Sequence, residues 1–400
     1  MSLDQAGSRR DVAWLFAGRG LRAVAYGLQS VLLGLYLDEA GLRPEAVGLM
    51  LTATLVGSAA LTMILGARAD RWGRRRSLLI GSLMTVIGAW VFATSELTWL
   101  WAAAALAGTI FAGAGEAGPL ENVESAILPQ IVSFADRNRI FGWSSALGAV
   151  GVAVGALAAG MARWAPSDSA GYRLGFGASG VLVLLSALVL TRLSAACETQ
   201  GIASPTRGLD RSRPLVVRLS ALFALDSLAG GFVVQGFVVY WFHQRFGAGA
   251  DVLGPTFFAV NLMKAVSYPA AARLADRFGL LPTMVFSHLP SNVLLILLPI
   301  MPTLGGAVAV LVLRHALAQM DVPTRAAYLV GIVDPDERTA ALSVTSSVRM
   351  AAHAVSPSLA GVVWQAAGAA TPFWLAGSLK AVYDIALYFG FRKVPPREES

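Results

Sequence analysis

Twelve stretches of this chain, each about 20 residues long, carry few or no charged side chains. That is the length an α-helix needs to cross the hydrocarbon core of a membrane. Only 14% of the 400 residues are charged and 56% are apolar, whereas about 25% of a soluble domain is charged. We therefore predict an all-α membrane protein whose twelve transmembrane helices begin near Ala13, Ala46, Ser77, Trp99, Ile140, Leu174, Leu215, Val252, Leu281, Gly305, Ala340 and Thr371.

The basic residues are distributed in a way that indicates membrane topology. The formal net charge of +7 would suit an acidic partner such as nucleic acid. Nineteen basic residues, however, fall in or beside the termini and the alternate loops of one side, against four in the other loops. Because basic loops stay in the cytoplasm, we predict a multi-pass protein of the cytoplasmic (inner) membrane, with both termini cytoplasmic and no nucleic-acid partner.

The first stretch and the cysteine content exclude other classes of protein. Arg19 and Arg22 lie inside the first stretch and no small-residue cleavage site follows it, so we expect a retained helix and not a signal peptide. The single Cys197 excludes a disulfide framework and a four-cysteine metal site. We expect no metal and no cofactor.

A loop motif occurs twice, which indicates an internal duplication. Ala69–Gly73 reads Ala-Asp-Arg-Trp-Gly, and Ala275–Gly279, 206 residues later, reads Ala-Asp-Arg-Phe-Gly. Ile131-Val132 recurs as Ile332-Val333 at an offset of 201. Several matches in the same order at nearly constant spacing favour two parallel half-transporters related by an axis along the membrane normal.

The middle of the chain contains the connection between these halves. The stretch from about Ser194 to Arg213 is the one loop rich in Ser, Thr, Pro, Gly and charge. We predict a six-helix bundle over residues 1–192, a cytoplasmic linker over 193–215, and a second six-helix bundle with a short tail over 216–400.

The segment from Gly66 to Arg75 resembles the cytoplasmic loop signature of the major facilitator superfamily, Gly-x-x-x-Asp-Arg-x-Gly-Arg-Arg. The weaker second copy, Ala272 to Leu281, also fits that family, and the resemblance covers nearly the whole chain. It implies a secondary transporter that works by alternating access. Segments 225–232 and 319–325 resemble a bacterial subgroup of mostly uncharacterised members, which supplies no substrate.

The chain departs from the drug/proton antiporters of this family at two places. The arginine that many of them carry before a Gly-x-Gly would fall at Thr109, and their Gly-Pro pair is missing from the glycine-rich span after Ile140. Proton-driven drug antiport is therefore not established by motif.

Charged side chains inside the apolar stretches are candidates for the mechanism, because an ionisable group in the bilayer is costly unless it is paired or hydrated. They are Arg19, Arg22, Glu116, Asp226, Lys264, Arg314, Arg349, His353, Lys380 and Asp384. Alignment of the two halves places Arg22 on Asp226. We predict an ion pair between the halves that breaks and re-forms during transport, with Asp226 as a protonation site; a static pair that only holds the packing is the alternative.

Three further side-chain sets share helix faces. Asn261, Lys264 and Tyr268 follow i, i+3, i+7 spacing and are candidates to hold an anionic or polar substrate, although Lys264 paired to Asp226 or to an acid of a neighbouring helix is also open. Arg349 and His353 share a face, where the histidine either relays a proton or is a buried, hydrogen-bonded side chain. Lys380 and Asp384 are predicted to neutralise each other.

An acidic cluster in one half faces a mixed cluster in the other. Glu116, Glu121 and Glu124 crowd the cytoplasmic end of their span, and the repeat alignment overlays Glu124 on Arg325, with Asp321 nearby. We predict a salt bridge between the halves at an inner gate; an exposed cluster that contributes little is the alternative.

The repeated loop is predicted to be a cytoplasmic latch. In the first copy Asp70 would pair with Arg74 and accept backbone amides at the start of the span near Thr339, while Gly66 allows close helix approach and Gly73 the turn. We include Arg71 in this latch. The second copy keeps Asp276, Arg277 and Gly279 but lacks the basic tail.

Gly113–Gly118 matches the Gly-x-Gly-x-x-Gly dinucleotide string, but no strand precedes it, so we interpret it as a small-residue packing surface. The chain also has no phosphate-binding Gly-Lys-Ser/Thr loop, which argues against ATP as the driving force.

We therefore predict a monomeric secondary transporter, not an enzyme, whose partners are a small-molecule substrate, protons and the lipid bilayer. Proton-coupled efflux by antiport is the favoured activity, with Asp226, Glu116 or His353 as coupling sites. Uptake or facilitated transport of an organic anion is one alternative, favoured by Arg19, Arg22, Lys264 and Arg314. A receptor-like membrane sensor is another, but the appended soluble domain it would need is not visible.

Overall fold

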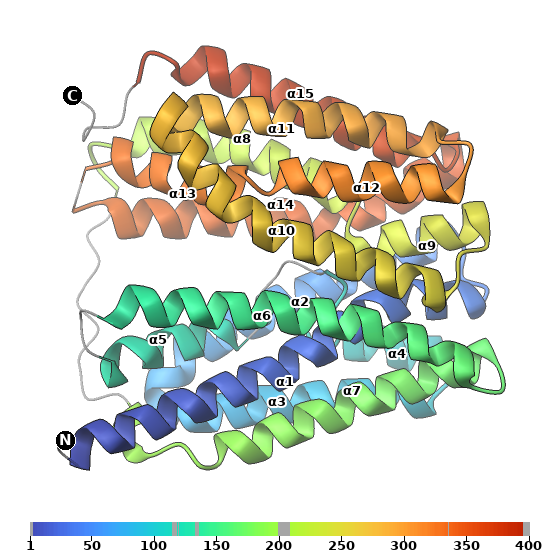
Figure 1. Ribbon diagram of the computed structural model, residues 1–400, viewed down its shortest axis with the longest axis horizontal. Coiled ribbons are helices and arrows are strands. Elements are labelled where there is room, and N and C mark those ends of the chain that lie inside the picture. Colours follow the sequence, from blue (N-terminus) through green and yellow to red (C-terminus); the bar gives the residue numbers. More distant parts are fainter. Residues whose placement is uncertain are drawn as a thin grey trace. The chain divides into compact units, whose positions relative to one another are not determined.

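The computed structural model describes residues 3–113, 118, 120–132, 136–198, 209–334 and 336–394, apart from the side chains of residues 3–8, 70, 129, 138 and 265. All regular secondary structure in these residues is helical (Figure 1). The predicted all-α class is therefore confirmed.

In its described residues, the first part of the chain forms seven α-helices and two 3₁₀ turns. They are α1 (Leu3–Glu39), α2 (Pro44–Trp72), α3 (Arg74–Thr94), α4 (Thr98–Leu106), α5 (Glu121–Ile131), α6 (Arg137–Ala159), η2 (Gly160–Trp164), α7 (Asp168–Leu190) and η3 (Ala195–Cys197).

As far as the structure describes it, the second part forms eight α-helices and one 3₁₀ turn. They are α8 (Arg213–Gly231), α9 (Gln235–Phe246), α10 (Ala250–Phe278), α11 (Leu280–Leu297), η4 (Leu298–Ile300), α12 (Leu304–Ala318), α13 (Asp321–Ile332), α14 (Arg338–Ala367) and α15 (Thr371–Phe391).

Eight stretches of the described helices are long and apolar enough to cross a membrane. They comprise α1, α2, α3, α6, α7, the pair α8–α9, α11 and the pair α12–α13. The helices α10, α14 and α15 have 29, 30 and 21 residues, which is also a spanning length, but they carry Lys264, Arg349 and Lys380 inside apolar sequence. Together with the interrupted pair α4–α5, these helices correspond to the other four predicted spans.

The chain forms two compact units, and the first comprises Met1–Leu42, Leu49–Gly201 and Gln235–Asn261. In unit 1, α1 packs against α6 and α7, and α7 packs against α3 (Figure 1). A Cβ on Gly27 would collide with the Val152 carbonyl, and one on Gly155 with the Val24 carbonyl. The glycines therefore let α1 and α6 approach closely, which is a common way to pack helices in a membrane.

Unit 2 comprises Arg43–Gly48, Ile202–Val234 and Leu262–Ser400. Here α8 packs against α14 and α15, and α11 packs against α12, α13 and α15. A Cβ on Gly231 would lie 2.5 Å from the His353 carbonyl oxygen, and one on Gly377 would lie 3.0 Å from the Asn292 carbonyl oxygen. These glycines bring α8 and α15 close to α14 and α11, and so position the polar side chains that the same helices carry.

The units divide α8–α9 and α10 differently from the predicted halves. Residues 235–261, which form α9 and the start of α10, belong to unit 1. The side chain of Gln235 donates to Ser30 Oγ at 2.8 Å, and that of Gln244 donates to Asp38 Oδ1 at 2.5 Å. These bonds attach α9 to α1.

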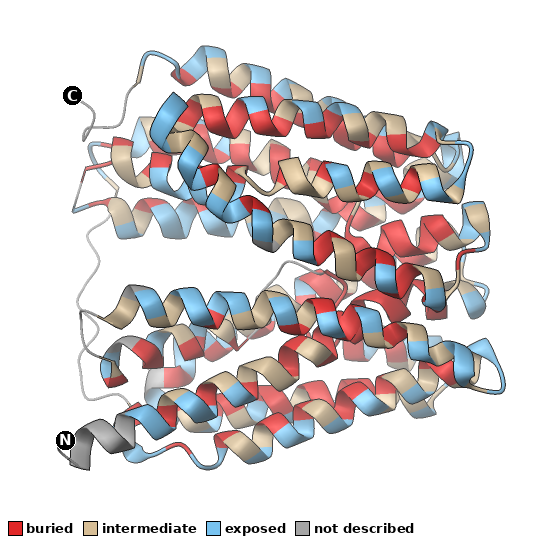
Figure 2. Ribbon diagram, viewed as in Figure 1, coloured by how far each residue is buried: buried red, intermediate tan, exposed pale blue. Residues whose placement is uncertain are grey.

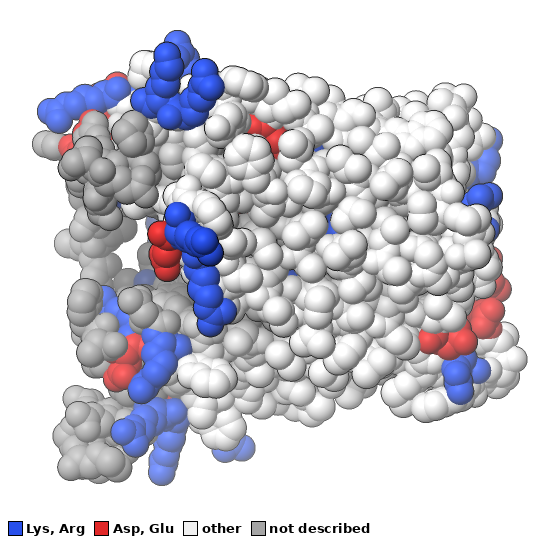
Figure 3. Space-filling model, turned by 45° about the horizontal axis from the view of Figure 1, so that its top comes forward, with Lys and Arg blue, Asp and Glu red and all other residues white. Residues whose placement is uncertain are grey.

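Burial alternates around the helices in both units, as Figure 2 shows. Many large apolar side chains point outward, among them Met63, Ile87 and Leu188. On the face shown in Figure 3, charged side chains gather toward the ends of the helices and leave a broad band with few charges between them. An outer surface of this kind suits contact with lipid.

Candidate functional site

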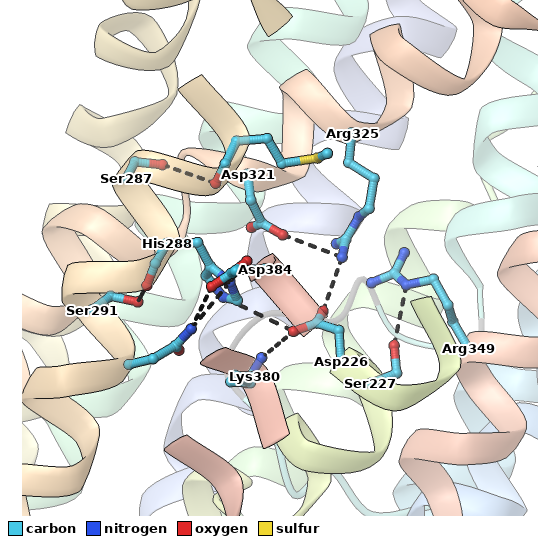
Figure 4. A network of polar contacts seen from close by, with 12 residues as sticks. Asp226, Ser227, Ser287, His288, Ser291, Asp321, Arg325, Arg349, Lys380 and Asp384 are labelled. Carbon is cyan, nitrogen blue, oxygen red and sulfur yellow. Dashed lines mark hydrogen bonds and ion pairs between the residues drawn. The ribbon is translucent and has the colours of Figure 1, made fainter. Parts of the chain in front are cut away.

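Asp226 of α8 is the centre of a buried charge cluster in unit 2. Lys380 Nζ of α15 donates to Asp226 Oδ1 at 2.5 Å, and Arg325 Nη1 of α13 donates to Asp226 Oδ2 at 3.0 Å (Figure 4). All three side chains are buried. A carboxylate removed from water is stabilised when both of its oxygens receive charge-assisted hydrogen bonds. Asp226 thereby links three helices.

A histidine connects this carboxylate to a second one. His288 Nδ1 of α11 lies 2.9 Å from Asp384 Oδ1 of α15, and His288 Nε2 lies 3.9 Å from Asp226 Oδ1. Asn292 Nδ2 donates to Asp384 Oδ2 at 2.7 Å. Each imidazole nitrogen therefore faces a different carboxylate, which is a geometry suited to passing a proton between them.

Local sequence explains why α11 presents this polar edge. Pro290 lies inside the helix, where it has no N–H to donate to the preceding turn. The hydroxyl of Ser287 donates to the Met284 carbonyl oxygen at 3.5 Å, and that of Ser291 donates to the His288 carbonyl oxygen at 2.7 Å. The small residue Gly377 lets α15 approach α11, so that Asp384 reaches His288.

Arg325 and Arg349 extend the cluster toward α13 and α14. The Arg325 guanidinium also contacts Asp321 Oδ2 at 3.2 Å and lies 5.5 Å from the centre of the Phe223 ring. Arg349 Nε donates to Ser227 Oγ at 3.2 Å, and His353 Nδ1 lies 3.2 Å from the Ser227 carbonyl oxygen. Arg349 and His353 therefore do share a helix face, which packs on α8 beside Asp226.

Unit 1 contains its own charge cluster. Arg19 Nη2 of α1 donates to Glu121 Oε1 of α5 at 2.5 Å, and Arg19 Nη1 lies 3.3 Å from Glu124 Oε2. Arg22 forms an ion pair with Glu124 and donates to Ser186 Oγ of α7 at 2.6 Å. The acidic residues of α5 thus neutralise the arginines of α1.

These partners bear on three predicted pairs. Arg22 and Asp226 each bind partners within their own unit, and the pair predicted between the halves stays a prediction. Glu124 likewise binds Arg19 and Arg22, and Arg325 binds Asp226 and Asp321, so the predicted gate bridge also stays a prediction. Lys380 and Asp384 do not neutralise each other, because Lys380 points to Asp226 and Asp384 to His288 and Asn292.

The remaining substrate candidates lie on α10 and α12. Asn261 is buried, and neither its amide nitrogen nor its amide oxygen has a hydrogen-bond partner in the described part of the chain. Lys264 is half-buried, and Tyr268 is 40% exposed. Arg314 is buried at the end of α12. Glu116 lies outside the described residues.

The repeated loop has a defined backbone at both copies. Gly73 and Gly279 have φ of 92° and 88°, which favours glycine, and each precedes the first residue of a helix. In the first copy the Glu198 carboxylate accepts the backbone amides of Arg74 at 2.7 Å and Arg75 at 3.3 Å. Glu198, which sequence reasoning missed, thus caps the start of α3.

The predicted latch residues have mixed outcomes. The Asp70 side chain lies outside the described residues, so its pairing with Arg74 stays a prediction; the Arg74 guanidinium donates to the Ala126 carbonyl at 2.9 Å. A Cβ on Gly66 would meet nothing within 4 Å, so no described helix of unit 1 approaches closely there, and an approach to the span near Thr339 stays a prediction. Arg71, Asp276 and Arg277 are exposed, and Arg277 lies over the Phe278 ring.

His288 and Asn292 are the main residues that sequence reasoning overlooked. A signal was available, because His288 is an ionisable side chain inside an apolar stretch of membrane-spanning length. Its role became visible only with its two carboxylate neighbours.

Long apolar helices that carry buried charge clusters are the features of a polytopic membrane protein with a functional site in its interior. The family model described as Major Facilitator Superfamily matches residues 15–262 and 219–400. The chain therefore belongs to the major facilitator superfamily and is a secondary transporter.

Two relatives resemble the chain in sequence. An uncharacterised membrane protein of Saccharomyces cerevisiae is 27% identical over 417 residues, which cover 94% of this chain and 93% of that protein. A class C tetracycline resistance protein of Escherichia coli is 26% identical over 234 residues, which cover 55% of this chain and 56% of that protein.

Solved structures show the same fold. A point mutant of the nucleoside transporter NupG superposes with a TM-score of 0.76 at 15% identity, covering 96% of this chain and 99% of that one. A D-xylose-proton symporter superposes with a TM-score of 0.73 at 16% identity, covering 98% of both chains.

Proposed function

We propose that this transporter exports a small solute across the cytoplasmic membrane in exchange for protons, with both termini in the cytoplasm. The observation that carries proton coupling is the His288 imidazole between the carboxylates of Asp226 and Asp384. Buried carboxylate and histidine series of this kind are how membrane transporters move protons.

Protonation of Asp226 has a direct structural consequence in this proposal. While ionised, Asp226 holds Lys380 and Arg325, and so ties α8 to α15 and α13. A proton on the carboxylate removes the charge that attracts both cations, which weakens the ties between the three helices. His288 then passes the proton to Asp384, and the ion pairs re-form. Binding and release of a proton would thus bias the two states of an alternating-access cycle.

Export is supported by the sequence likeness to a tetracycline resistance protein. Uptake or facilitated transport of an organic anion is the second candidate. It is favoured by the basic side chains along the helices of unit 2, where Lys264, Arg314, Arg325, Arg349 and Lys380 outnumber Asp226, Asp321 and Asp384, while the buried carboxylates Asp334 and Glu337 lie before the start of α14.

The purified protein in liposomes tests both direction and coupling. The probes are tetracycline, ethidium, benzoate and succinate, with a pH gradient of either polarity. Antiport predicts that an acidic lumen drives a probe inward, because protons leave as the solute enters; symport predicts the same for an alkaline lumen. Transport of a probe with no response to either gradient would contradict proton coupling.

Asp226→Asn assigns the coupling site. We expect gradient-driven accumulation to fall at least tenfold, while exchange of labelled for unlabelled probe without a gradient continues, because exchange needs no net proton movement. Glu96→Gln is the matched control, since Glu96 is an exposed carboxylate paired with Arg173. If Asp226→Asn does not fold, His288→Gln is measured in its place. This variant is also expected to lose the gradient-driven accumulation of the probe.

A further inference from the structure

Arg314 is a buried cation that has no carboxylate at ion-pair distance among the described residues. Its side chain lies within the candidate span Leu304–Ile332 and is 8% exposed. Arg314 Nη1 lies 3.3 Å from His315 Nε2, and Arg314 Nε has no hydrogen-bond partner among the residues that the structure describes. Within the described ranges no carboxylate forms an ion pair with it, in contrast to Arg325 and Lys380, which both reach Asp226.

The surroundings of Arg314 add positive charge. Lys264 of α10 is near enough for its charge and that of Arg314 to repel, and His315 is influenced by both. Asp226 attracts Arg314 from a distance, but its two oxygens are already occupied by Lys380 and Arg325. Among the described residues Arg314 therefore has no carboxylate in ion-pair contact, in a medium where an uncompensated charge is costly.

His315 cannot supply the missing charge. Its Nδ1 lies 2.8 Å from the Leu311 carbonyl oxygen, so this nitrogen donates and the other is left as an acceptor toward Arg314. The His315 ring is then neutral and accepts a hydrogen bond from one of the five N–H donors of the Arg314 guanidinium. The other N–H groups of Arg314 remain for a ligand, in the planar fork that matches a carboxylate.

We infer that Arg314, assisted by Lys264, binds a carboxylate group of the transported solute, so that the cargo is an organic anion. On α10, Lys264 is half-buried and Tyr268, one turn further on the same face, is 40% exposed. The inference rests on the proposed function only in taking the bound anion to be the transported solute. It concerns the binding step and not the proton.

Thermal unfolding of the full chain in detergent measures this binding without a gradient. The probes are benzoate, succinate and citrate, with sodium chloride at equal ionic strength and tetraethylammonium chloride as controls. At least one carboxylate is expected to raise the Tm of the wild type in a saturable way, because a ligand that binds the folded state stabilises it by mass action. The two chloride salts are expected to have no saturable effect.

Variants assign the effect to Arg314. Arg314→Gln is expected to weaken the apparent affinity at least tenfold, and Arg314→Lys to weaken it less, because the charge remains while the planar fork is lost. Arg218→Gln, which changes an exposed arginine of α8, is expected to bind as the wild type does. If Arg314→Gln does not fold, Arg314→Lys and Lys264→Gln give the same comparison.

Two outcomes would overturn the inference: no stabilisation of the wild type by any of the carboxylates, or equal stabilisation of the wild type and the Arg314 variants. Carboxylate binding that depends on Arg314, together with transport that ignores the pH gradient, would sustain this inference and refute the proton coupling. Gradient-driven transport of ethidium without any carboxylate binding would refute this inference and support the proton coupling.

Discussion

Two buried arginines of unit 2, one on α12 and one on α13, differ in their surroundings. Arg325 has carboxylates at 3.0 and 3.2 Å, whereas Arg314 has a histidine nitrogen at 3.3 Å. A buried ion pair with complete hydrogen bonding can be purely structural. A buried cation without a protein anion is stable only if a ligand supplies the negative charge. For this reason Arg325 has a helix-linking role, whereas a ligand-binding role is inferred for Arg314.

Glu337 is a structural carboxylate at the end of the helices, and its effect should depend on pH. The amides of Asp210, Ser212 and Arg211 donate to it within 2.9 Å, and they lower the pKa of Glu337 from the ordinary 4.5 to about 2. The ionised form is thus favoured by folding. Its stabilising contribution is fully present above pH 4.5 and is lost as the pH falls toward 2.

Glu337→Gln tests this contribution. We expect the variant to have a lower Tm than the wild type at about pH 7, and the difference to shrink as the pH is lowered from 4.5 toward 2. Asp276→Asn is the control, because Asp276 makes no ion pair among the described residues and should leave the Tm unchanged. A constant difference between Glu337→Gln and the wild type over this pH range would disprove the role of the charge.

At the scale of helices, close packing positions the Asp226 cluster. The pair α8–α14 touches at Gly231, where a Cβ would lie 2.5 Å from the His353 carbonyl oxygen and from Ser356 Cβ. Because one of these atoms belongs to the backbone, an added methyl group must move the helices apart. The same shift would displace Ser227 from Arg349 and His353.

Gly231→Ala is therefore expected to destabilise the protein. Overpacking of this kind costs about 1–3 kcal/mol, less the gain of up to about 1 kcal/mol from replacing a helical glycine. Gly142→Ala in α6 is the matched control, since a Cβ there meets nothing within 4 Å, and it should be neutral or stabilising. Chemical denaturation of both variants measures the difference; a Gly231→Ala protein as stable as Gly142→Ala would refute tight packing at this contact.

At the scale of the whole chain, the predicted topology can be tested with single cysteines. The native Cys197 is buried, and burial together with the nearby Asp11 raises the pKa of its thiol to about 12. It should therefore stay unlabelled by maleimide, which reacts with the thiolate. This leaves a clean background for introduced cysteines.

Glu96→Cys and Arg76→Cys report opposite sides of the membrane. Glu96 lies between α3 and α4 with its side chain 80% exposed, and Arg76 is exposed in the first turn of α3. In intact cells a membrane-impermeant maleimide should label Glu96→Cys only, and Arg76→Cys should react after permeabilisation. The reversed pattern would place the termini outside the cell.

The sequence alone was sufficient for the membrane class, the all-α fold and the family. The lengths of the apolar stretches determine which segments can span a bilayer. The duplicated Ala-Asp-Arg-x-Gly loop depends on a local turn, in which Gly73 and Gly279 adopt positive φ. Both properties are local along the chain. Spacing within one helix was equally reliable, because α14 places Arg349 and His353 on one face against Ser227, as predicted.

Only the tertiary structure decided which charges meet. Helical spacing shows that Lys380 and Asp384 share a face, but it does not show that α8 and α11 both pack on α15. Because of this packing, Lys380 contacts Asp226 and Asp384 contacts His288. Repeat alignment paired Arg22 with Asp226, while the structure gives each a partner within its own unit. Ion pairs act over a few ångströms, and distances of that size are determined by how the helices pack.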